Sequence, residues 1–463
     1  MMAWFRKQKR ARNDCRCFIG TFTALVLIEA AGVYRARSTG SSLTIRGQLP
    51  IVLTPNISTM TLYDRLVQCE QAMQGLAGAA PDAKTITRLR REWGDDLAQL
   101  MTTSAALQSK AESKLGPGPW WVSEKSLQQS TPWQVAQLKS QWFGDRTVYD
   151  LCCGIGGDAF QLARRGPVVA VDRDETVAAM AAVNLGRLGD VKNASARCDD
   201  VTQVDVPADA AIHVDPDRRA GGRRTSDPDQ YEPDWSEVLR MIDHVPAAII
   251  KLAPAAMPEI PSTMDTARLW ISLSGSVREQ SLLLGEVIGQ SGLQSGHRAA
   301  YRAGQDGVWS RFVVSHDQID EVSHYRGKSN GAQAIGECLI DPDGAIRAAG
   351  LTIAFANQNR LRLVGKPSGF LTGDESVASL ILNSGMGLVG RVIWSGAADD
   401  RKLRRELRSR NVYPETIKVR GSEHDPLALT RRYRSTGERP VTLWLSRAGE
   451  RVYAAITEPI LAT

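Results

Sequence analysis

Apolar residues return every three or four positions between Met60 and about Lys139, and this spacing predicts amphipathic helices. The pattern is clearest in LYDRLVQCEQAMQGL, TITRLRREWGDDLAQLM and SLQQSTPWQVAQLKSQW. The stretch Gly116–Trp121, GPGPWW, interrupts it with glycine and proline, and its paired tryptophans are expected to pack rather than to bind a ligand. Residues 60–145 are therefore predicted to form a helical N-terminal subdomain.

Beyond this subdomain, short apolar runs alternate with helical patterns. TVYDLCC and PVVAVD are strand-like, and each precedes a helix-like stretch, GDAFQLARRG and ETVAAMAAVNLGRLG. Further short strands are predicted over ASARCDDV, AAIHVDPD, AAIIKLAP, RLWISLSG and SRFVVS. The alternation indicates βαβ units, a mostly parallel sheet and an α/β fold over residues 146–330. Ligands of such sheets bind at the carboxyl ends of the strands, where the polar residues fall in this sequence.

A third region, residues 336–463, follows the polar and glycine-containing joint HYRGKSNGAQ. It contains the helix-like DDRKLRRELRSRN, the strand-like TIKVRG, the helix-like DPLALTRRYRS and a hairpin pattern in VTLWLSRAGERVYAAI. The sequence predicts a small α+β domain here, and it shows no internal repeat.

Composition supports a globular, multidomain protein. The 463 residues are 43% hydrophobic and 23% charged, which argues against general disorder and against a protein with many membrane spans. The net charge of +6 is concentrated: Arg391 to Arg451 holds 15 Lys or Arg against 8 Asp or Glu, so a polyanion is a plausible partner of the C-terminal region. The seven cysteines lack zinc-ligand spacing, and their odd number is typical of reduced thiols in a cytoplasmic protein without a structural metal.

The N-terminus has features of a signal peptide, because the basic segment Arg6–Arg16 precedes the apolar run Phe18–Val33. That run is short for a bilayer span and contains Glu29, and no clean small-residue cleavage site follows it. The alternatives are a disordered leader over residues 1–59 or an over-extended reading frame with Met60 as the true start. No membrane association is expected.

The turn after the first strand of the α/β region, DLCCGIGGD, carries Gly154, Gly156 and Gly157. Glycines between a strand and a helix let the backbone approach a ligand and direct free helical N–H groups toward it. Together with Ala159 the turn also satisfies the relaxed dinucleotide fingerprint G-x-G-x-x-A. Taken alone, it fits a nicotinamide cofactor, S-adenosylmethionine or a purely structural tight turn.

Acidic residues at successive strand ends favour S-adenosylmethionine. Asp150 precedes the glycines and Asp158 follows them, where carboxylates suit a sulfonium and an ammonium group rather than a pyrophosphate. Asp172 ends the second strand and could accept hydrogen bonds from both ribose hydroxyls, a role that would also suit NAD. Asp199 and Asp200 follow the third strand and could accept from an adenine amino group, or could instead cap a helix or turn.

The motifs DLCCGIGGD, AVDRD, CDDV, VDPDRRAGGRR and KLAP together resemble the class I S-adenosylmethionine-dependent methyltransferases. More narrowly, they resemble the bacterial branch with a C-terminal THUMP-like domain, over roughly Trp120 to the C-terminus. The resemblance implies a Rossmann-like, seven-stranded sheet whose last strand is antiparallel, and S-adenosyl-L-methionine as the cofactor. The cofactor-binding residues that it implies are Asp150, Cys152, Gly154, Gly156, Gly157, Asp158, Asp172, Asp199 and Asp200.

The acceptor would lie at HVDPDRR, after the fourth strand. There the side chain of Asp215 and a carbonyl directed by Pro216 could accept the two N–H bonds of a base amine. Related amino-methylating enzymes carry a second proline and an aromatic residue next, whereas this chain has Asp217 and Arg218. Stacking on an aromatic ring contributes about 1–3 kcal/mol per base, so either another group replaces it or the acceptor is not a planar amine. The six histidines are scattered and none is assigned a catalytic role.

Basic residues suggest that the substrate is RNA. In the loop after the acceptor motif and in the third region, the candidates for RNA contacts are Arg219, Arg223, Arg224, Arg404, Arg405, Arg408, Lys418, Arg420, Arg431 and Arg432. A charged helix is more often a solvated face, but a THUMP-like domain implies RNA. The sequence thus predicts a cytoplasmic methyltransferase of tRNA or rRNA. A methyltransferase of a small molecule or protein, and a binding protein without catalysis, remain alternatives, and the oligomeric state is not predicted.

Overall fold

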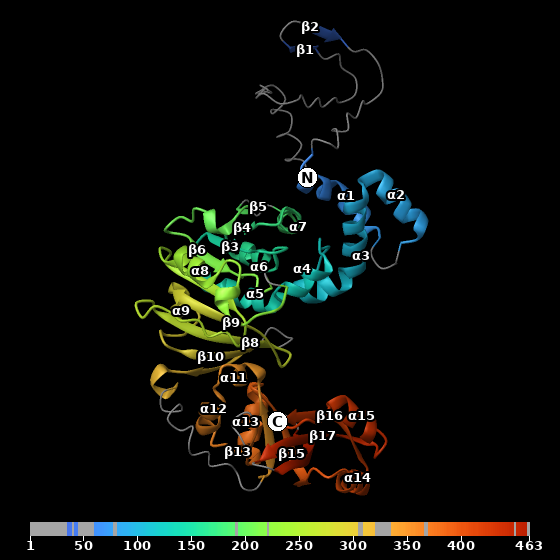
Figure 1. The fold of residues 1–463 in the computed structure, drawn as a ribbon, viewed down its shortest axis with the longest axis vertical. Helices are drawn as coiled ribbons and strands as arrows, with labels where there is room; N and C mark the ends of the chain where they lie inside the picture. Colours follow the sequence, from blue (N-terminus) through green and yellow to red (C-terminus); the bar gives the residue numbers. More distant parts are fainter. Residues whose placement is uncertain are drawn as a thin grey trace, which may run out of the picture. The chain divides into compact units, whose positions relative to one another are not determined.

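The computed structural model describes residues 35–38, 41–44, 60–76, 81–189, 193–219, 222–303, 309–319, 335–364, 369–448 and 451–460. The chain divides into two units, residues 1–60 and 61–463. The first unit contributes β1 (Arg35–Ser38) and β2 (Ser41–Thr44), an antiparallel pair. Most of the predicted leader lies outside the described residues. The rest of the description concerns the second unit (Figure 1).

The second unit begins with helices, as the apolar spacing predicts. They are α1 (Leu62–Gln74), α2 (Ala83–Trp93), α3 (Asp95–Leu115), α4 (Glu124–Gln129) and α5 (Trp133–Ser140). The α3 helix ends where Gly116 takes a φ of +98° and a proline follows. Trp120 and Trp121 are fully buried, so both tryptophans pack in the core as expected.

A buried asparagine joins this helical segment to the rest of the unit. Asn184, on α7 (Glu175–Gly186), accepts a hydrogen bond from Trp121 N at 2.9 Å. Its amide group donates to the carbonyl oxygens of Trp121 at 3.1 Å and Ile155 at 3.0 Å. Because Ile155 lies within the glycine-rich turn, the helical segment is tied directly to that turn.

The central sheet has nine strands in the order β11-β10-β8-β9-β7-β6-β3-β4-β5. Their bounds are β3 (Val148–Leu151), β4 (Val168–Asp172), β5 (Ala194–Cys198), β6 (Ala211–Val214), β7 (Ala247–Leu252), β8 (Thr266–Leu273), β9 (Ser276–Gly285), β10 (Arg298–Ala303) and β11 (Trp309–Val314). Strands β5, β4, β3, β6 and β7 are parallel neighbours. β9 runs antiparallel between β7 and β8, β10 is parallel to β8, and β11 is antiparallel to β10.

The strand count corrects the implied seven-stranded sheet. β3 to β9 are seven strands, and the last of them, β9, is antiparallel as implied, but β10 and β11 extend the sheet to nine. β9 and β10 were not predicted from the sequence. β9 is exposed at its start and buried on both faces over its second half, so it lacks a two-residue period. β10 contains three alanines, which have low strand propensity.

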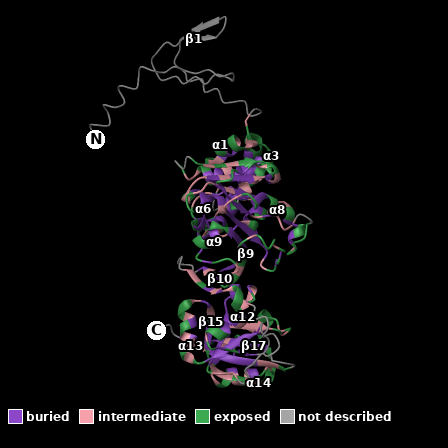
Figure 2. Ribbon diagram, turned by 90° about the vertical axis from the view of Figure 1, so that its left-hand side faces the viewer, coloured by how far each residue is buried: buried purple, intermediate pink, exposed green. Residues whose placement is uncertain are grey.

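The central strands are largely buried (Figure 2), and their side chains alternate between two apolar clusters. Ile249 belongs to the cluster that includes the N-terminal helices and α6 (Gly157–Arg165), whereas its neighbour Ile250 packs with α8 (Trp235–Ile242). Both faces are therefore covered, which leaves the strand ends as the sites where polar side chains meet.

The C-terminal region contains a second sheet, ordered β13-β14-β12-β15-β18-β17-β16. Its strands are β12 (Cys338–Pro342), β13 (Arg362–Val364), β14 (Phe370–Gly373), β15 (Gly387–Ala397), β16 (Val412–Arg420), β17 (Arg439–Ala448) and β18 (Arg451–Pro459). Its helices are α11 (Gly344–Ala348), α12 (Thr352–Gln358), α13 (Glu375–Ser384), α14 (Asp400–Ser409) and α15 (Pro426–Tyr433). The predicted elements after residue 399 are all present, whereas the elements between 338 and 397 were not predicted.

The two sheets share a hydrophobic cluster. Trp270 and Phe312 of the nine-stranded sheet are buried together with Ile340 and Phe355 of the C-terminal region. The rings of Phe312 and Phe355 meet edge to face, with centroids 5.1 Å apart. The shared cluster makes one continuous core across the junction.

Candidate active site

A cavity of about 880 Å³ lies at the carboxyl ends of β3, β4, β6 and β7. The turns that follow these strands line it, and residues of α4 and of the segment between α4 and α5, including Gln128, Ser130 and Thr131, line it too. This is where a parallel sheet with helices on both faces binds its ligands. The cavity is large enough for a cofactor and part of a substrate.

The glycine-rich turn presents bare backbone to the cavity. Gly154 has a φ of +56° and Gly156 a φ of +82°, both in the left-handed region that glycine adopts without strain. A Cβ added to Gly154 would meet no atom within 4 Å, so this position is open. Gly157 begins α6, and a Cβ there would lie 3.4 Å from a methyl group of Leu115. Cys152, with a φ of +58°, completes the tight turn and lines the cavity.

Asp172 connects the second strand to this turn. One of its carboxylate oxygens accepts a hydrogen bond from Gly154 N at 2.9 Å, and the other accepts from Asp174 N at 3.1 Å. Burial raises the pKa of Asp172 above its ordinary value, and the two backbone hydrogen bonds oppose this shift. The carboxylate lines the cavity.

The two acids after β5 take different positions. Asp200 lines the cavity, and it also caps the following turn by accepting from Thr202 N at 2.9 Å. Asp199 is exposed and is not among the residues that line the cavity, and its carboxylate lies 3.5 Å from Arg197 Nε. The capping alternative therefore applies to Asp200, and Asp199 lies outside the cavity lining.

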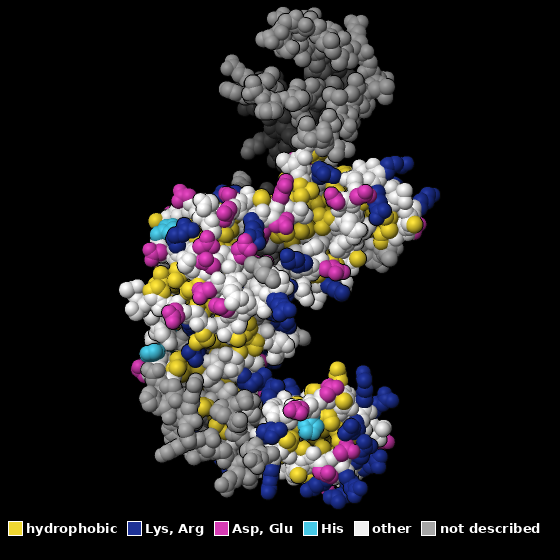
Figure 3. All heavy atoms as spheres, viewed as in Figure 1, with side chains coloured by type: hydrophobic (Ala, Val, Ile, Leu, Met, Phe, Trp, Pro, Cys, Tyr) yellow, Lys and Arg dark blue, Asp and Glu magenta, His cyan; other side chains and the backbone are white. Residues whose placement is uncertain are grey.

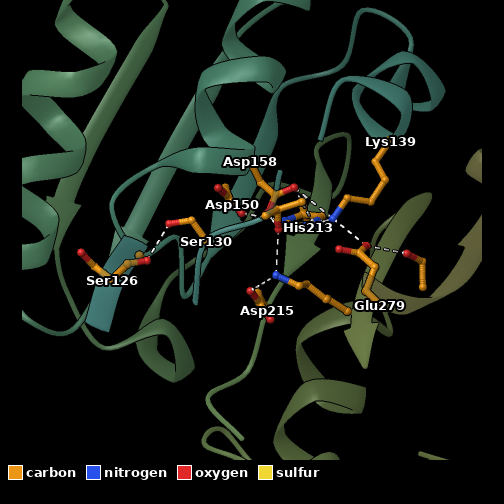
Figure 4. A network of polar contacts seen from close by, with 12 residues as sticks. Ser126, Ser130, Lys139, Asp150, Asp158, His213, Asp215 and Glu279 are labelled. Atoms are coloured by element: carbon orange, nitrogen blue, oxygen red, sulfur yellow. Dashed lines mark hydrogen bonds and ion pairs between the residues drawn. The ribbon is translucent and has the colours of Figure 1, made fainter. Parts of the chain in front are cut away.

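Asp150 and Asp158 line the cavity, and both are also held in a polar network (Figure 4). Asp150 is 2.7 Å from His213 Nδ1, and its second oxygen, Oδ2, has no partner among the described residues. Burial raises the pKa of Asp150. Both oxygens of Asp158 are engaged, by Lys139 Nζ at 3.0 Å and by the Thr131 hydroxyl at 2.5 Å. Burial alone would raise the pKa of Asp158, but Lys139 above all holds it well below its ordinary value.

Lys139 is the centre of the network, although no motif in the sequence pointed to this lysine. Besides Asp158, its ammonium contacts Glu279 Oε1 at 2.9 Å and His213 Nε2 at 3.0 Å. Because an ammonium only donates, His213 Nε2 is the acceptor, and the ring proton lies on Nδ1 facing Asp150. Burial would lower the pKa of Lys139, but Asp158 and Glu279 raise it above its ordinary value. His213 thus has a structural place in the network and does not line the cavity.

At the acceptor end, Asp215 follows β6 and lines the cavity with Pro216, Asp217 and Arg218. Asp215 Oδ2 is 2.5 Å from Lys251 Nζ. Asp217 supports the loop, because its carboxylate accepts a hydrogen bond from the backbone N–H two residues ahead at 3.0 Å. Arg218 Nη1 is buried and has no hydrogen-bond partner among the described residues.

Cations gather near this end of the cavity. Arg219 and Arg224 line it, and the neighbouring charge of Arg218, more than burial or Arg219, lowers the pKa of Arg224. Lys114 also lines the cavity, and its pKa is lowered to about 8 by burial first and then by the nearby charges of Lys251 and Arg278. Arg223 is exposed and outside the cavity lining. The cavity is therefore acidic where β4 and β5 end and basic beside the loop that follows β6.

No aromatic side chain of the described residues lines the cavity. Tyr231, in the loop after the acceptor motif, is 5% exposed, and its hydroxyl accepts a hydrogen bond from Ala253 N at 3.3 Å. The missing aromatic residue after Asp-Pro is therefore not replaced by another ring in this structure.

The basic residues of the C-terminal region gather over α14 and α15 (Figure 3). Most of them face acids: Arg404 and Arg432 contact Asp400, Arg405 contacts Glu406, and Lys418 and Arg420 contact Asp341. Arg408 and Arg431 are exposed and have no hydrogen-bond or ion-pair partner in the described part of the chain. On α14 the apolar edge is real, because Leu403 and Leu407 are buried.

Comparison with known proteins identifies the general class. Two Mycobacterium tuberculosis proteins, from strains CDC 1551 / Oshkosh and ATCC 25618 / H37Rv, are 29% identical over 379 residues, which is 78% of this chain and 96% of each relative. Both are described as uncharacterized S-adenosylmethionine-dependent methyltransferases. The chain is an S-adenosylmethionine-dependent methyltransferase. No family model matches it.

The fold of this methyltransferase agrees with a solved structure. A crystal structure of a Porphyromonas gingivalis W83 protein, assigned as a methyltransferase, superposes with a TM-score of 0.64 at 16% identity. The match covers 87% of this chain and all of the other. The matched share of the chain is larger than the part that forms the nine-stranded sheet and its helices, so the structural similarity extends to other parts of the chain. The predicted Rossmann-like α/β class is confirmed.

The residues of the cavity suit S-adenosylmethionine, the cofactor of this class. Gly154 leaves open space at the turn, and Asp172 and Asp200 offer carboxylate oxygens where a ribose and an adenine would be held. The unpartnered Oδ2 of Asp150 could accept a hydrogen bond from the ammonium group. Asp158 also lines the cavity, but its oxygens contact the Lys139 ammonium and the Thr131 hydroxyl, so it supports the turn from within the network.

Among the described residues, no helix is long and apolar enough to cross a bilayer. The same residues contain no group of three or more His, Cys, Asp or Glu side chains that could hold a metal ion.

Proposed function

We propose that this methyltransferase modifies a nucleotide of tRNA or rRNA in the cytoplasm, and that its C-terminal region is a THUMP-like domain that helps to hold the RNA. One observation carries the proposal: the cavity is acidic where the cofactor fits and basic where the acceptor would enter, and a buried guanidinium nitrogen of Arg218 there has no partner in the described part of the chain. A polyanionic substrate with a group that can reach into the cavity fits this distribution of charge.

Asp215 and Pro216 are proposed to hold the acceptor. Asp215 Oδ1 has no partner among the described residues and can accept an N–H of a base, while the backbone carbonyl at Pro216 can accept a second. Bound S-adenosylmethionine would supply the methyl group: the nitrogen lone pair would bond to the methyl carbon as the carbon–sulfur bond breaks with its electron pair left on sulfur, and the nitrogen would release one proton to water. The chain chiefly has to keep the reacting atoms aligned.

Arg218 is proposed to replace the missing aromatic residue. It stands where related amino-methylating enzymes carry an aromatic ring, and it lines the cavity. A guanidinium is planar and stacks on nucleobases, so Arg218 can cover one face of the acceptor base. Asp217 then serves the loop that presents this arginine.

Arg219, Arg223 and Arg224 are proposed to contact phosphates next to the acceptor nucleotide. Arg219 and Arg224 reach the cavity, and Arg223 lies on the exposed part of the same loop. Guanidinium groups bind phosphate oxygens with two parallel hydrogen bonds, and the mutual repulsion of these cations is relieved when an anion is bound.

The C-terminal surface is proposed to position the RNA through its backbone. Arg408 and Arg431 are exposed without a partner among the described residues. The exposed pairs of Arg404, Arg405 and Arg432 with acids are worth about 0–1 kcal/mol each, so RNA phosphates can compete for these arginines. Lys418 and Arg420 face the buried Asp341 and are less available. Phosphate contacts fix register and orientation without reading sequence.

The direct test is transfer of a labelled methyl group from S-adenosylmethionine to total RNA from a host strain that lacks this gene. The full chain is expected to label RNA, and Asp172→Ala and Asp215→Ala are expected not to. If the cofactor binds but no label enters RNA, the RNA proposal is wrong. Label found in metabolites or in protein would then identify the acceptor class, and no label in any fraction would indicate a binding protein without catalysis.

RNA affinity supplies a second test. The logarithm of the affinity should fall steeply with the logarithm of salt concentration, because phosphate contacts release counterions. Replacing both Arg408 and Arg431 with Ala should weaken binding and reduce the slope by about one unit for each lost contact. Affinity that does not respond to salt would count against the C-terminal surface.

A further inference from the structure

We propose that Lys251 is a positioning residue for methyl transfer: it fixes the carboxylate of Asp215 so that a single oxygen, Oδ1, is presented to the acceptor. The role rests on the proposed function only in taking Asp215 as the group that holds the acceptor. Lys251 lies in the KLAP motif, whose lysine has no role from the sequence.

The sheet register places the two residues side by side. β6 and β7 are parallel neighbours, with Val214 opposite Ile250. The next residues are Asp215, directly beyond the end of β6, and Lys251, within β7. Lys251 Nζ lies 2.5 Å from Asp215 Oδ2. Both residues line the cavity, but the Lys251 side chain is only 6% exposed and the Asp215 side chain 26% exposed, so the carboxylate is the more accessible of the two to an acceptor.

A second contact holds the lysine itself. Lys251 Nζ donates to the Thr131 hydroxyl at 2.8 Å, and that hydroxyl donates to Asp158 at 2.5 Å. Asp158 is in turn paired with Lys139 at the centre of the network. Figure 4 shows Asp215, Asp158 and Lys139 in this one cluster. Lys251 is therefore anchored from the protein interior, and through it the position of Asp215 depends on the network.

The charges around Lys251 exclude a role as a base. Asp215, Glu279 and Asp158 attract its ammonium, while Lys139 repels it. Burial would lower the pKa of Lys251, but these carboxylates raise it above its ordinary value. The lysine therefore keeps its proton at neutral pH and acts as a fixed cation. Asp215 Oδ2 is occupied by that cation, which leaves Oδ1 to accept a hydrogen bond from the acceptor.

The test compares Lys251→Met with Asp215→Asn and with the double variant. Lys251→Met should lower the single-turnover methyl-transfer rate to RNA by about 10- to 100-fold, because misplacing a positioning group by about 1 Å can cost about 100-fold. S-adenosylhomocysteine affinity should stay within twofold of the wild type. Since Lys251 acts through Asp215, adding Lys251→Met to Asp215→Asn should cause no further loss.

Conservative variants separate positioning from folding. Lys251→Arg keeps the charge and should recover part of the rate that Lys251→Met loses. If Lys251→Met does not fold, Lys251→Gln is used in the same cycle, because it keeps a polar group for Thr131 and removes the charge. A general structural role would lower cofactor affinity and thermal stability together and would not be cancelled by Asp215→Asn.

The outcomes distinguish this proposal from the proposed function. RNA labelling by the wild type with additive losses in the cycle would overturn the role of Lys251 and leave the RNA function standing. If the wild type labels another acceptor, the cycle is run with that acceptor, and non-additive losses would support Lys251 while the RNA function fails. If no acceptor is found, the cycle is measured by thermal unfolding, and strictly additive changes in Tm would overturn the contact.

Discussion

Asp172 combines two tasks in one carboxylate. It accepts hydrogen bonds from the backbone of the glycine turn, and it faces the cavity where the cofactor ribose fits. Asp172→Asn should lower the affinity for S-adenosylhomocysteine by about 10- to 100-fold, because hydrogen bonds to charged groups contribute about 1.5–3 kcal/mol. Isothermal titration calorimetry measures this loss. Asp199→Asn is the matched control, because Asp199 lies outside the cavity lining, and its affinity should equal that of the wild type.

The pH dependence of binding should report the same carboxylate. The pKa of Asp172 is raised by burial, so its ionised form is lost earlier on acidification than in an exposed aspartate. Ribose hydroxyls donate to the ionised form, and cofactor affinity should therefore fall as the pH drops through the raised pKa. Titrations between pH 7 and about pH 4 should show the fall in the wild type and a flatter profile in Asp172→Asn. Equal profiles would exclude Asp172 as the titrating group.

Lys139 is the residue whose loss should cost most stability. Its side chain is 1% exposed and its ammonium balances Asp158 and Glu279, so Lys139→Met leaves these carboxylates without that counter-charge. Breaking such a pair costs about 3–5 kcal/mol, which chemical denaturation at neutral pH would measure. Lys139→Met combined with Glu279→Gln should be more stable than Lys139→Met alone, and a further loss in the double variant would contradict this account.

Acidification should reduce the loss of unfolding free energy that Lys139→Met causes. In the wild type the pKa of Asp158 lies below its unfolded value of about 3.9, so its stabilising contribution is complete above that value and is lost as the pH falls through the folded pKa. In the variant, burial without Lys139 favours the protonated form of Asp158, so the folded variant gains protons on acidification. The difference in unfolding free energy between the two proteins should therefore decrease from neutral pH toward pH 4.

At the scale of single elements, substitutions of two glycines should distinguish an effect on stability from an effect on cofactor binding. Gly154→Ala places a side chain at a φ of +56°, which costs about 1–2 kcal/mol, and the added methyl group points into open space at the cavity. Gly275 is the control, since its φ is +76° and a Cβ there would also meet nothing within 4 Å, but it lies outside the cavity lining. Both variants should lose similar stability, and only Gly154→Ala should lose cofactor affinity. Equal affinities would remove Gly154 from the cofactor site.

The elements that could be read from the sequence are those with a local signal. The strand-end acids and the glycine turn follow from alternating strands and helices, and Asp172 and Asp200 do line one cavity. The buried network could not be predicted, because Lys139 is an ordinary polar position in a helical pattern and Glu279 lies on β9, a strand without two-residue alternation. Lys251 lies in the KLAP motif, but only the register of β6 with β7 shows that it lies beside Asp215.

At the scale of the whole second unit, we expect the two sheets to unfold together, because they share a hydrophobic cluster. Phe355 is 3% exposed and packs against Phe312 across the junction of the two sheets. Phe355→Ala should cost about 3–5 kcal/mol. Because the core is continuous, denaturation of the full chain should show one transition, and S-adenosylhomocysteine should shift that whole transition upward. Circular dichroism would reveal a second, cofactor-independent transition if the C-terminal sheet unfolded separately. Leu380→Ala, at a side chain 68% exposed, is the control and should change little.

The helical segment before the sheet also limits which substrates can enter the cavity. Gln128, Ser130 and Thr131 line the same cavity as the strand-end residues, so Asp215 is reached through a walled space rather than on an open face. An RNA base within a double helix is stacked on its neighbours and too wide, with its partner, for such a space. If RNA is the acceptor, the base has to be flipped out of the helix or taken from an unpaired loop, and a nucleotide that is already unstacked should be methylated fastest.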